Sequence, residues 1–117
     1  MLYTTFTVKD KEYKARLTAK ACVDLEKKLG TNPLNVFMGM MSSETVVLPK
    51  MEVMITILHA SLQAYEHGVT IEKVYEIYDA FVDEGKTLMD LVPILIDIFK
   101  VSGFLPEEAE EATIKNA

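Results

Sequence analysis

Histidine is the side chain best suited to acid–base catalysis near neutral pH, and this chain of 117 residues contains two. His59 and His67 fall on the polar side of a predicted helix and lie eight residues apart. In a helix that spacing corresponds to a rise of about 12 Å, which is too far for both rings to bind one metal ion. We therefore interpret both histidines as solvated side chains.

The one cysteine, Cys22, shares a predicted helix face with Leu25 and Leu29. This position predicts a small buried hydrophobic side chain, because a nucleophilic cysteine needs an exposed setting and a neighbouring base. The sequence also lacks a glycine-rich phosphate loop and the G-x-S-x-G, C-x-x-C and H-E-x-x-H motifs. We predict no catalytic, cofactor-binding or metal-binding residues, and a protein that is not an enzyme.

Four carboxylates form the most distinct charge pattern, within an arc of about 60° on a predicted helix. They are Glu72, Glu76, Asp79 and Asp83. Like charges at this spacing cost a few tenths of a kcal/mol per pair. We favour the interpretation of this stripe as a solvated helix face. A docking surface for a basic partner is the second interpretation, and a metal site is the third. We keep the four residues as candidates for binding a partner.

A methionine cluster gives the second set of candidates, within the short stretch "FMGMM". Methionine fills irregular gaps in cores and is also favoured on adaptable binding surfaces. On a short helix Phe37, Met40 and Met41 can face the core together, whereas Met38 must point elsewhere. Core filler and partner-binding surface both remain open for Met38, Met40 and Met41.

Composition limits the kinds of partner. The chain carries 18 acidic and 12 basic residues, a net charge of −6, which argues against nucleic acid and anionic membranes. The most apolar segment, residues 88–101, is shorter than the roughly 20 residues of a membrane span. The N-terminus does not resemble a secretion signal, and one cysteine allows no internal disulfide, so we expect a cytoplasmic protein.

A β-hairpin is predicted at the start of the chain, because residues 2–8 and 12–17 alternate between apolar and polar positions. Residues 9–11 supply a polar turn between them. A lone hairpin is marginal in water, so its apolar face must pack on the rest of the chain. The residues expected to do so are Leu2, Phe6, Val8, Tyr13, Ala15 and Leu17.

Five helices should follow, with caps at Thr18, Asn32, Thr70 and Thr87 and stops at glycines. The expected ranges are 19–29, 33–41, 50–67, 71–84 and 88–102. In the third helix we expect a buried side made of Met51, Met54, Ile55, Leu58, Ser61, Leu62 and Tyr65. In the fourth we expect one made of Ile71, Val74, Tyr75, Tyr78, Phe81 and Val82.

The fifth helix is apolar around most of its circumference, with a polar strip only about 80° wide. It is either the central helix of the domain or partly covered by another chain. Pro93 should kink it or split off its first turn. The predicted fold is mainly α with a small N-terminal β-hairpin (α+β), in one domain over residues 1–105. That domain comprises a hairpin at 2–17 and helices at 18–103, and an acidic tail follows at 106–117.

Three stretches carry a family resemblance. They are "KEYKARLTAKACVDLEKKLGTNPLNVF", "ILHASLQAYEHGVTIEKVYEIYDAF" and "LVPILIDIFKVSGF". From about Phe6 to Leu105 the chain resembles the tail assembly chaperones of long-tailed bacteriophages and prophages of Gram-positive bacteria. The turn at residues 9–11 departs from the Asn-Gly or Asp-Gly that hairpins favour.

The resemblance implies a binding protein that coats the tape-measure protein in the bacterial cytoplasm, helps recruit tail tube subunits and is absent from the mature virion. It implies no catalytic residues. A longer form is often made by ribosomal frameshifting, and Lys115-Asn116 is compatible with a slippery run of codons.

A coat protein for an aggregation-prone helix needs an adaptable apolar surface and many weak contacts, so self-association is expected. The alternative is a small regulatory or adaptor module that docks a basic helical partner through the acidic stripe.

Overall fold

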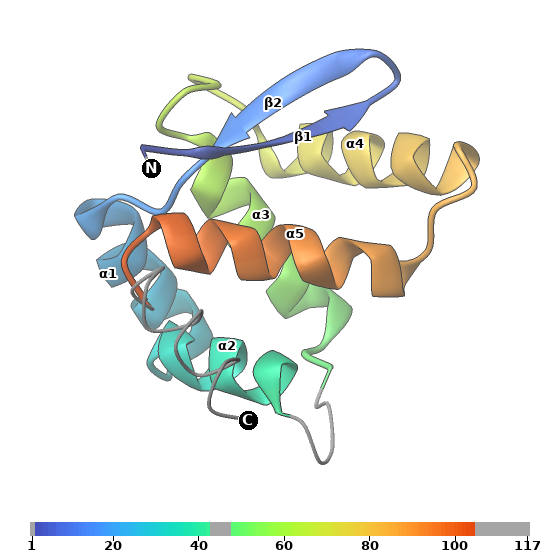
Figure 1. Ribbon diagram of the computed structural model, residues 1–117. Coiled ribbons are helices and arrows are strands. Elements are labelled where there is room, and N and C mark those ends of the chain that lie inside the picture. The colour runs from blue at the N-terminus through green and yellow to red at the C-terminus, as the bar shows by residue number, and fades with distance from the viewer. Residues whose placement is uncertain (1, 43–47, 105–117) are drawn as a thin grey trace.

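The computed structural model describes residues 2–42 and 48–104, and it confirms a mainly α fold with an N-terminal hairpin (Figure 1). The elements are β1 (Thr4–Val8), β2 (Lys11–Ala15), α1 (Ala19–Leu29), α2 (Pro33–Met41), α3 (Met51–Leu62), α4 (Ile71–Asp83) and α5 (Leu88–Val101). The predicted acidic tail and the proposed frameshift site lie outside the described residues. Among the described helices, none has the length and hydropathy required to cross a membrane.

The hairpin is antiparallel, with Val8 paired to Lys11 next to the turn and Thr4 paired to Ala15 at the far end. Lys9 and Asp10 form the connection, with φ angles of 48° and 65°. Positive φ at both central residues is the pattern of a type I′ turn, which matches the twist of the strands. The backbone N–H of Lys9 donates a hydrogen bond to Glu84 Oε1, so the turn is attached to the end of α4.

One face of the hairpin packs onto the helices, as the alternation predicts. Phe6, Val8, Tyr13 and Ala15 are buried, and Leu17 just after the hairpin is buried as well. The prediction was wrong for Leu2, whose side chain is 69% exposed. Leu2 precedes the paired part of β1, and none of the described helices or strands covers it.

Helix caps form where the sequence predicts them. Thr18 Oγ1 accepts from Ala21 N at 3.2 Å, Asn32 Oδ1 from Leu34 N at 2.9 Å, and Thr70 Oγ1 from Lys73 N at 3.1 Å. Each bond satisfies one of the backbone N–H groups that have no partner in a first helical turn. These caps fix where α1, α2 and α4 begin.

The helix α3 ends at Leu62, five residues before the predicted end. Gln63 Nε2 bonds the carbonyl oxygens of His59 and Val69, at 3.1 Å and 2.9 Å, and Nε2 of His59 lies 3.0 Å from the same Val69 oxygen. This cluster ties the end of α3 to the segment before α4. The interpretation of His59 as a solvated side chain was therefore wrong, because it is half-buried.

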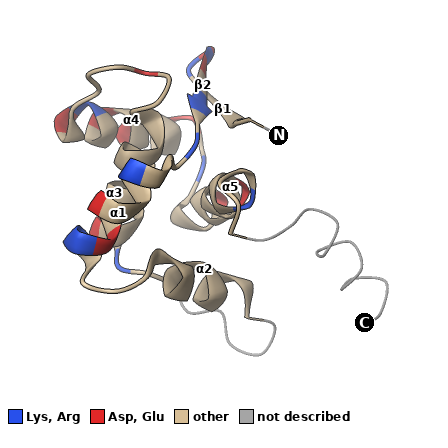
Figure 2. Cartoon of the chain, turned by 90° about the vertical axis from the view of Figure 1, so that its left-hand side faces the viewer, with Lys and Arg blue, Asp and Glu red and all other residues tan. Residues whose placement is uncertain are grey.

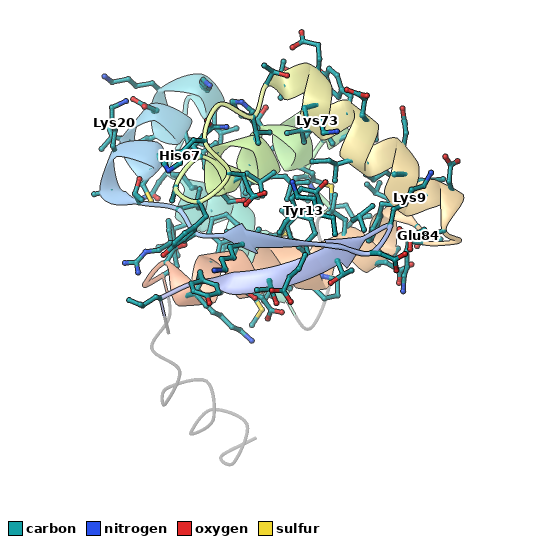
Figure 3. All side chains as sticks on the ribbon, turned by 90° about the horizontal axis from the view of Figure 1, so that it is seen from above. Lys9, Tyr13, Lys20, His67, Lys73 and Glu84 are labelled. Carbon is teal, nitrogen blue, oxygen red and sulfur yellow. The ribbon has the colours of Figure 1, made fainter. Side chains whose placement is uncertain are left out.

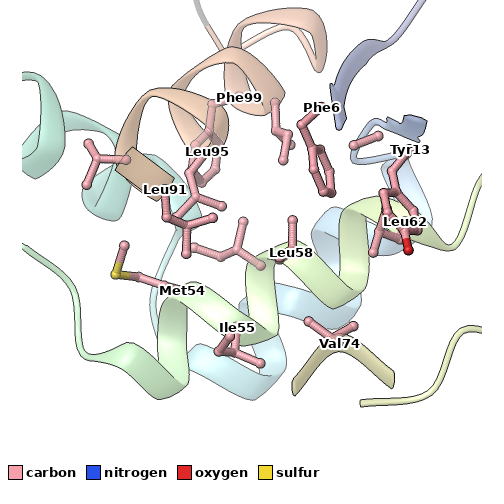
Figure 4. Packing of buried hydrophobic residues seen from close by; sticks show 14 of the residues in the cluster. Phe6, Tyr13, Met54, Ile55, Leu58, Leu62, Val74, Leu91, Leu95 and Phe99 are labelled. Carbon is pink, nitrogen blue, oxygen red and sulfur yellow. The ribbon is translucent and has the colours of Figure 1, made fainter. Parts of the chain in front are cut away.

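The core is built around α3, which packs against α1, α4, α5 and β2. Met54, Ile57, Leu58 and Leu62 are nearly or completely buried, and Figure 4 shows α3 side chains between those of α5, α4 and the hairpin. The expected burial of Met51 was wrong, since its side chain is 44% exposed. Tyr65 lies beyond the helix and is 37% exposed.

The buried side of α4 differs from the predicted one. Val74, Ile77 and Phe81 are buried, with the i, i+3, i+7 spacing of one helical stripe. Tyr75 and Val82, which we expected inside, are 52% and 43% exposed. Ile77 takes the core position because it lies on the same helical stripe as Val74 and Phe81, from which Tyr75 and Val82 are rotated away.

The helix α5 lies between the hairpin, α3 and α2, so the chain itself covers most of its apolar surface (Figure 1). It runs unbroken through Pro93, so the first turn is not split off, and the kink that was the other expectation stays a prediction. Pro93 is on the exposed side, where the carbonyl group of Met89 that lacks a helical N–H partner can reach water. The alternative in which another chain covers α5 is not needed to bury its five core side chains.

The end of α5 ties the hairpin to the helices. Ser102 Oγ accepts a hydrogen bond from Leu17 N at 2.9 Å and donates one to Ile98 O at 2.6 Å. Gly103 has a φ of 90°, and the N–H of Phe104 bonds Phe99 O at 3.1 Å. The rings of Phe99 and Phe104 lie 4.9 Å apart, which is the apolar contact expected after such a helix end.

Candidate partner-binding surfaces

The methionines of α2 divide between the core and the surface. Met40 is 4% exposed and packs with Phe37, whose ring lies 5.3 Å from that of Phe99. Met38 and Met41 are 58% and 37% exposed. Met38 and Met41 therefore remain available to a partner, and Met40 does not.

Two further apolar side chains, which the sequence did not single out, are exposed where α3 begins. Leu48 is 40% exposed and Met51 is 44% exposed. Figure 1 places the end of α2 and the beginning of α3 at the same end of the molecule. We call Met38, Met41, Leu48 and Met51 the methionine surface.

The part of this surface on α2 has no charges beside it in the helix, whereas Lys50 and Glu52 flank Met51 on α3. The helix α2 contains no charged residue, which Figure 2 shows as an uninterrupted tan ribbon. Thioether and aliphatic side chains without neighbouring charges can adapt to apolar partners of different shapes. The arrangement suits a surface that grips apolar helices without selecting one sequence strictly.

The acidic stripe lies on the side of α4 opposite its buried residues. Glu72, Glu76, Asp79 and Asp83 are all exposed. Within the described part of the chain none of the four takes part in an ion pair or a side-chain hydrogen bond. Their negative charges are therefore not neutralised by the fold, and the exposed rings and methyl groups of Tyr75 and Val82 lie along one margin.

Metal-ligating side chains do not gather beside these surfaces within the described part of the chain. Among the described residues there is no group of three or more His, Cys, Asp or Glu side chains that could hold a metal ion. Cys22 is half-buried, and its Sγ lies 3.9 Å from the carbonyl oxygen of Leu17. Burial raises the pKa of the Cys22 thiol, which disfavours the thiolate that a nucleophile requires.

Two surface hollows each include two or three lysines among their lining residues. One of about 440 Å³ lies between α1 and the start of α3, beside Lys28 and Lys50. Another of about 280 Å³ lies between the hairpin and α4, where Figure 3 shows Lys9, Tyr13 and Lys73. Lys11 in this second hollow is paired with Glu66 at 3.3 Å. Neither hollow contains a cysteine, serine or histidine that a neighbouring base could activate.

Comparison with known proteins places the chain in a family. A family model described as "Family of unknown function (DUF6096)" matches residues 2–117. The chain belongs to DUF6096. No curated protein and no solved structure matches it. The description of this family names no activity, so a function has to be inferred from the surfaces of this chain.

Proposed function

We propose that this member of DUF6096 is a tail assembly chaperone of a long-tailed bacteriophage or prophage. In this role it coats the tape-measure protein in the cytoplasm of the bacterial host and helps recruit tail tube subunits. It then leaves before the virion is complete. The proposal starts from the resemblance of residues 6–105 to that class of protein.

The methionine surface is the observation that supports the proposal most directly. A tape-measure protein is long, helical and apolar, and until the tube forms around it something must cover its apolar side chains. Four exposed apolar side chains, two of them on the uncharged helix α2, offer that cover. Because the contacts are few, the binding of each chaperone molecule is weak, which allows displacement by tube subunits.

A co-purification experiment tests this role. The chain is co-expressed with the tape-measure protein expected to be encoded next to it, and the amount retained on the tagged chain is measured. Met38→Glu should reduce retention by about tenfold, because burying a charge against an apolar partner costs about 1.4 kcal/mol or more. Val23→Glu is the matched control, since Val23 is 53% exposed on α1, and it should retain as much as the wild type.

The alternative function is a regulatory or adaptor module that docks a basic helical partner through the acidic stripe. The exposure and missing ion pairs of these carboxylates favour it. Replacing both Glu76 and Asp79 by Lys distinguishes the two functions in the same co-purification. Loss of the partner in this variant, with full retention by Met38→Glu, supports the adaptor and contradicts the chaperone.

A further inference from the structure

The first strand of the hairpin differs from the second in composition. The five residues of β1, "TTFTV", contain no charge and no proline, whereas β2, "KEYKA", contains three charged residues. Proteins usually protect exposed strand edges with charges, prolines or bulges, because an unprotected edge pairs with other strands. β1 lacks all of these protections.

The pairing register shows which backbone groups of β1 are available. A two-residue turn makes Val8 and Lys11 a hydrogen-bonded pair, and bonded pairs then alternate along the ladder to Phe6–Tyr13 and Thr4–Ala15. The N–H and C=O groups of Thr5 and Thr7 therefore point away from β2. No other hydrogen bond within the described residues uses them.

The residues before β1 continue its direction. Arg16 Nη1 donates a hydrogen bond to Leu2 O at 3.1 Å, which holds the start of the chain beside the end of β2. Tyr3 then has the same orientation as Thr5 and Thr7, by the two-residue period of a strand. Three alternate residues thus present backbone donors and acceptors to the outer edge.

This edge is on the outside of the molecule. Thr5 and Thr7 are exposed, and Figure 2 shows β1 on the side of the hairpin away from α4, with no described helix beyond it. The face of β1 that carries Phe6 and Val8 packs onto α4 and α5, so a new strand would extend the sheet over the helices.

We propose that a second copy of this chain pairs its own β1 with this edge, antiparallel and around a two-fold axis at Thr5. The two hairpins then form one four-stranded sheet. Thr5 pairs with the same residue of the second copy, and Tyr3 pairs with Thr7. Three bonded pairs provide about six backbone hydrogen bonds, two for each pair.

Charge and apolar contacts favour a second copy as the occupant. Two molecules of net charge −6 repel one another. Because β1 contains no charged residue, two copies can pair along it without placing like charges opposite one another. β2 instead carries Lys11, Glu12 and Lys14, and charged side chains of this kind protect a strand edge from pairing. The two-fold pairing also places Leu2, 69% exposed, beside Val8 of the second copy.

The pairing is independent of the tape-measure contact, because it uses neither the methionine surface nor the acidic stripe. Its test is the mass in solution, measured by light scattering after size exclusion for the full chain at about 100 μM. Wild type should have twice the chain mass. Thr5→Pro should raise the dissociation constant at least about tenfold and give the chain mass, because it removes an outward N–H that the hairpin does not use.

Lys14→Pro is the matched control for this variant. Lys14 faces Thr5 across the hairpin, and its N–H points to the opposite edge of β2, so its loss should leave the dimer intact. Circular dichroism and thermal melting confirm that both variants are folded. A wild-type monomer at this concentration, or a Thr5→Pro dimer as stable as wild type, overturns the proposal.

A charge exchange tests the two-fold register without proline. Thr5→Lys and Thr5→Glu should each be monomeric, because the pairing places like charges opposite one another. An equimolar mixture should form a mixed dimer with twice the chain mass. A mixture that stays monomeric, or single variants that still dimerise, contradicts pairing at Thr5. An edge that binds an extended peptide from another protein while wild type remains monomeric overturns the proposal too.

Discussion

Met38 and Met40 lie two residues apart on α2, and their side chains differ in solvent exposure. This difference separates the methionine surface from the core side of the helix. Met40 is 4% exposed and Met38 is 58% exposed. Removing a buried methionine leaves a cavity as well as losing apolar contacts, whereas an exposed one loses little. We therefore expect a substitution of Met40 to lower stability and a substitution of Met38 to weaken partner binding.

We predict that Met40→Ala lowers the free energy of unfolding by about 2–5 kcal/mol. Met38→Ala should change it by less than about 0.5 kcal/mol, because its side chain is already mostly in water. Urea unfolding followed by circular dichroism measures both values. Equal losses for the two variants would contradict the division of α2 into a core side and a surface side.

The thiol of Cys22 gives a prediction about pH. Burial raises its pKa in the folded chain, so the folded state holds its proton at a pH where the unfolded chain has begun to lose it. The stabilisation from the protonated thiol is complete below the pKa of Cys22 in the unfolded chain. It is lost as the pH rises through the higher pKa of Cys22 in the folded chain.

Alkylation of Cys22 by iodoacetamide at pH 8 should accordingly be slower in the folded chain than in urea, where the thiol is solvated. The rate in the folded chain should keep increasing at pH values where the rate in urea has levelled off. Mass spectrometry of quenched samples measures both rates. Faster modification of the folded chain would indicate an activated thiol and contradict its burial.

At the scale of elements, the turn between β1 and β2 uses unfavourable residues for its shape. Lys9 and Asp10 both have positive φ, which costs side chains other than Gly and Asn some energy. Replacing them by Asn and Gly supplies the preferred type I′ pair and keeps the Lys9-position N–H that bonds Glu84. We predict that this double variant is more stable by about 0.5–1 kcal/mol.

Thermal melting tests the turn prediction. Reversing the substitution order, with Gly at position 9 and Asn at position 10, is a control that relieves the same φ angles with a less favoured pair. Both variants should melt at a higher temperature than the wild type. A lower melting temperature for the Asn-Gly variant would show that the Lys9 or Asp10 side chain contributes more than the turn conformation.

The elements themselves could be predicted because local signals determine them. Thr18, Asn32 and Thr70 are side chains that cap helices, and each accepts the expected backbone hydrogen bond. The alternation of Phe6, Val8, Tyr13 and Ala15 predicted the buried face of the hairpin. These signals act within a few residues, so no knowledge of the tertiary arrangement is needed.

The packing of the elements was harder to predict, because it depends on distant neighbours. Apolar periodicity alone favoured Tyr75 and Val82 as core residues of α4, yet Ile77 is the buried one. The predicted end of α3 was five residues late because Gln63 and His59 turn to the carbonyl group of Val69. Neither contact follows from a helical wheel.

At the scale of the whole molecule, the candidate partner-binding surfaces belong to different elements around a core centred on α3. The methionine surface, the acidic stripe of α4 and the outer edge of β1 belong to separate elements. A chain arranged this way can hold an apolar helix with one side and another copy of itself with another. Many weak contacts then act together along one long partner.

The sequence indicated part of the methionine surface and missed the rest. It named Met38, Met40 and Met41, of which the fold buries Met40. Leu48 was missed because it precedes the helix, where no apolar period applies, and Met51 was missed because the apolar pattern of α3 favoured the core. The exposure of the acidic stripe was predicted correctly for all four residues, since four like charges on one helix face must point to water.

We propose that the methionine surface keeps an apolar tape-measure helix in solution. The most direct test is light scattering after an apolar helical segment of the tape-measure protein is diluted from denaturant into increasing amounts of the chain. Wild type and Val23→Glu should suppress the scattering equally, and Met38→Glu should need several-fold more protein for the same effect. Failure of the wild type to suppress it, or equal suppression by Met38→Glu, would contradict the account.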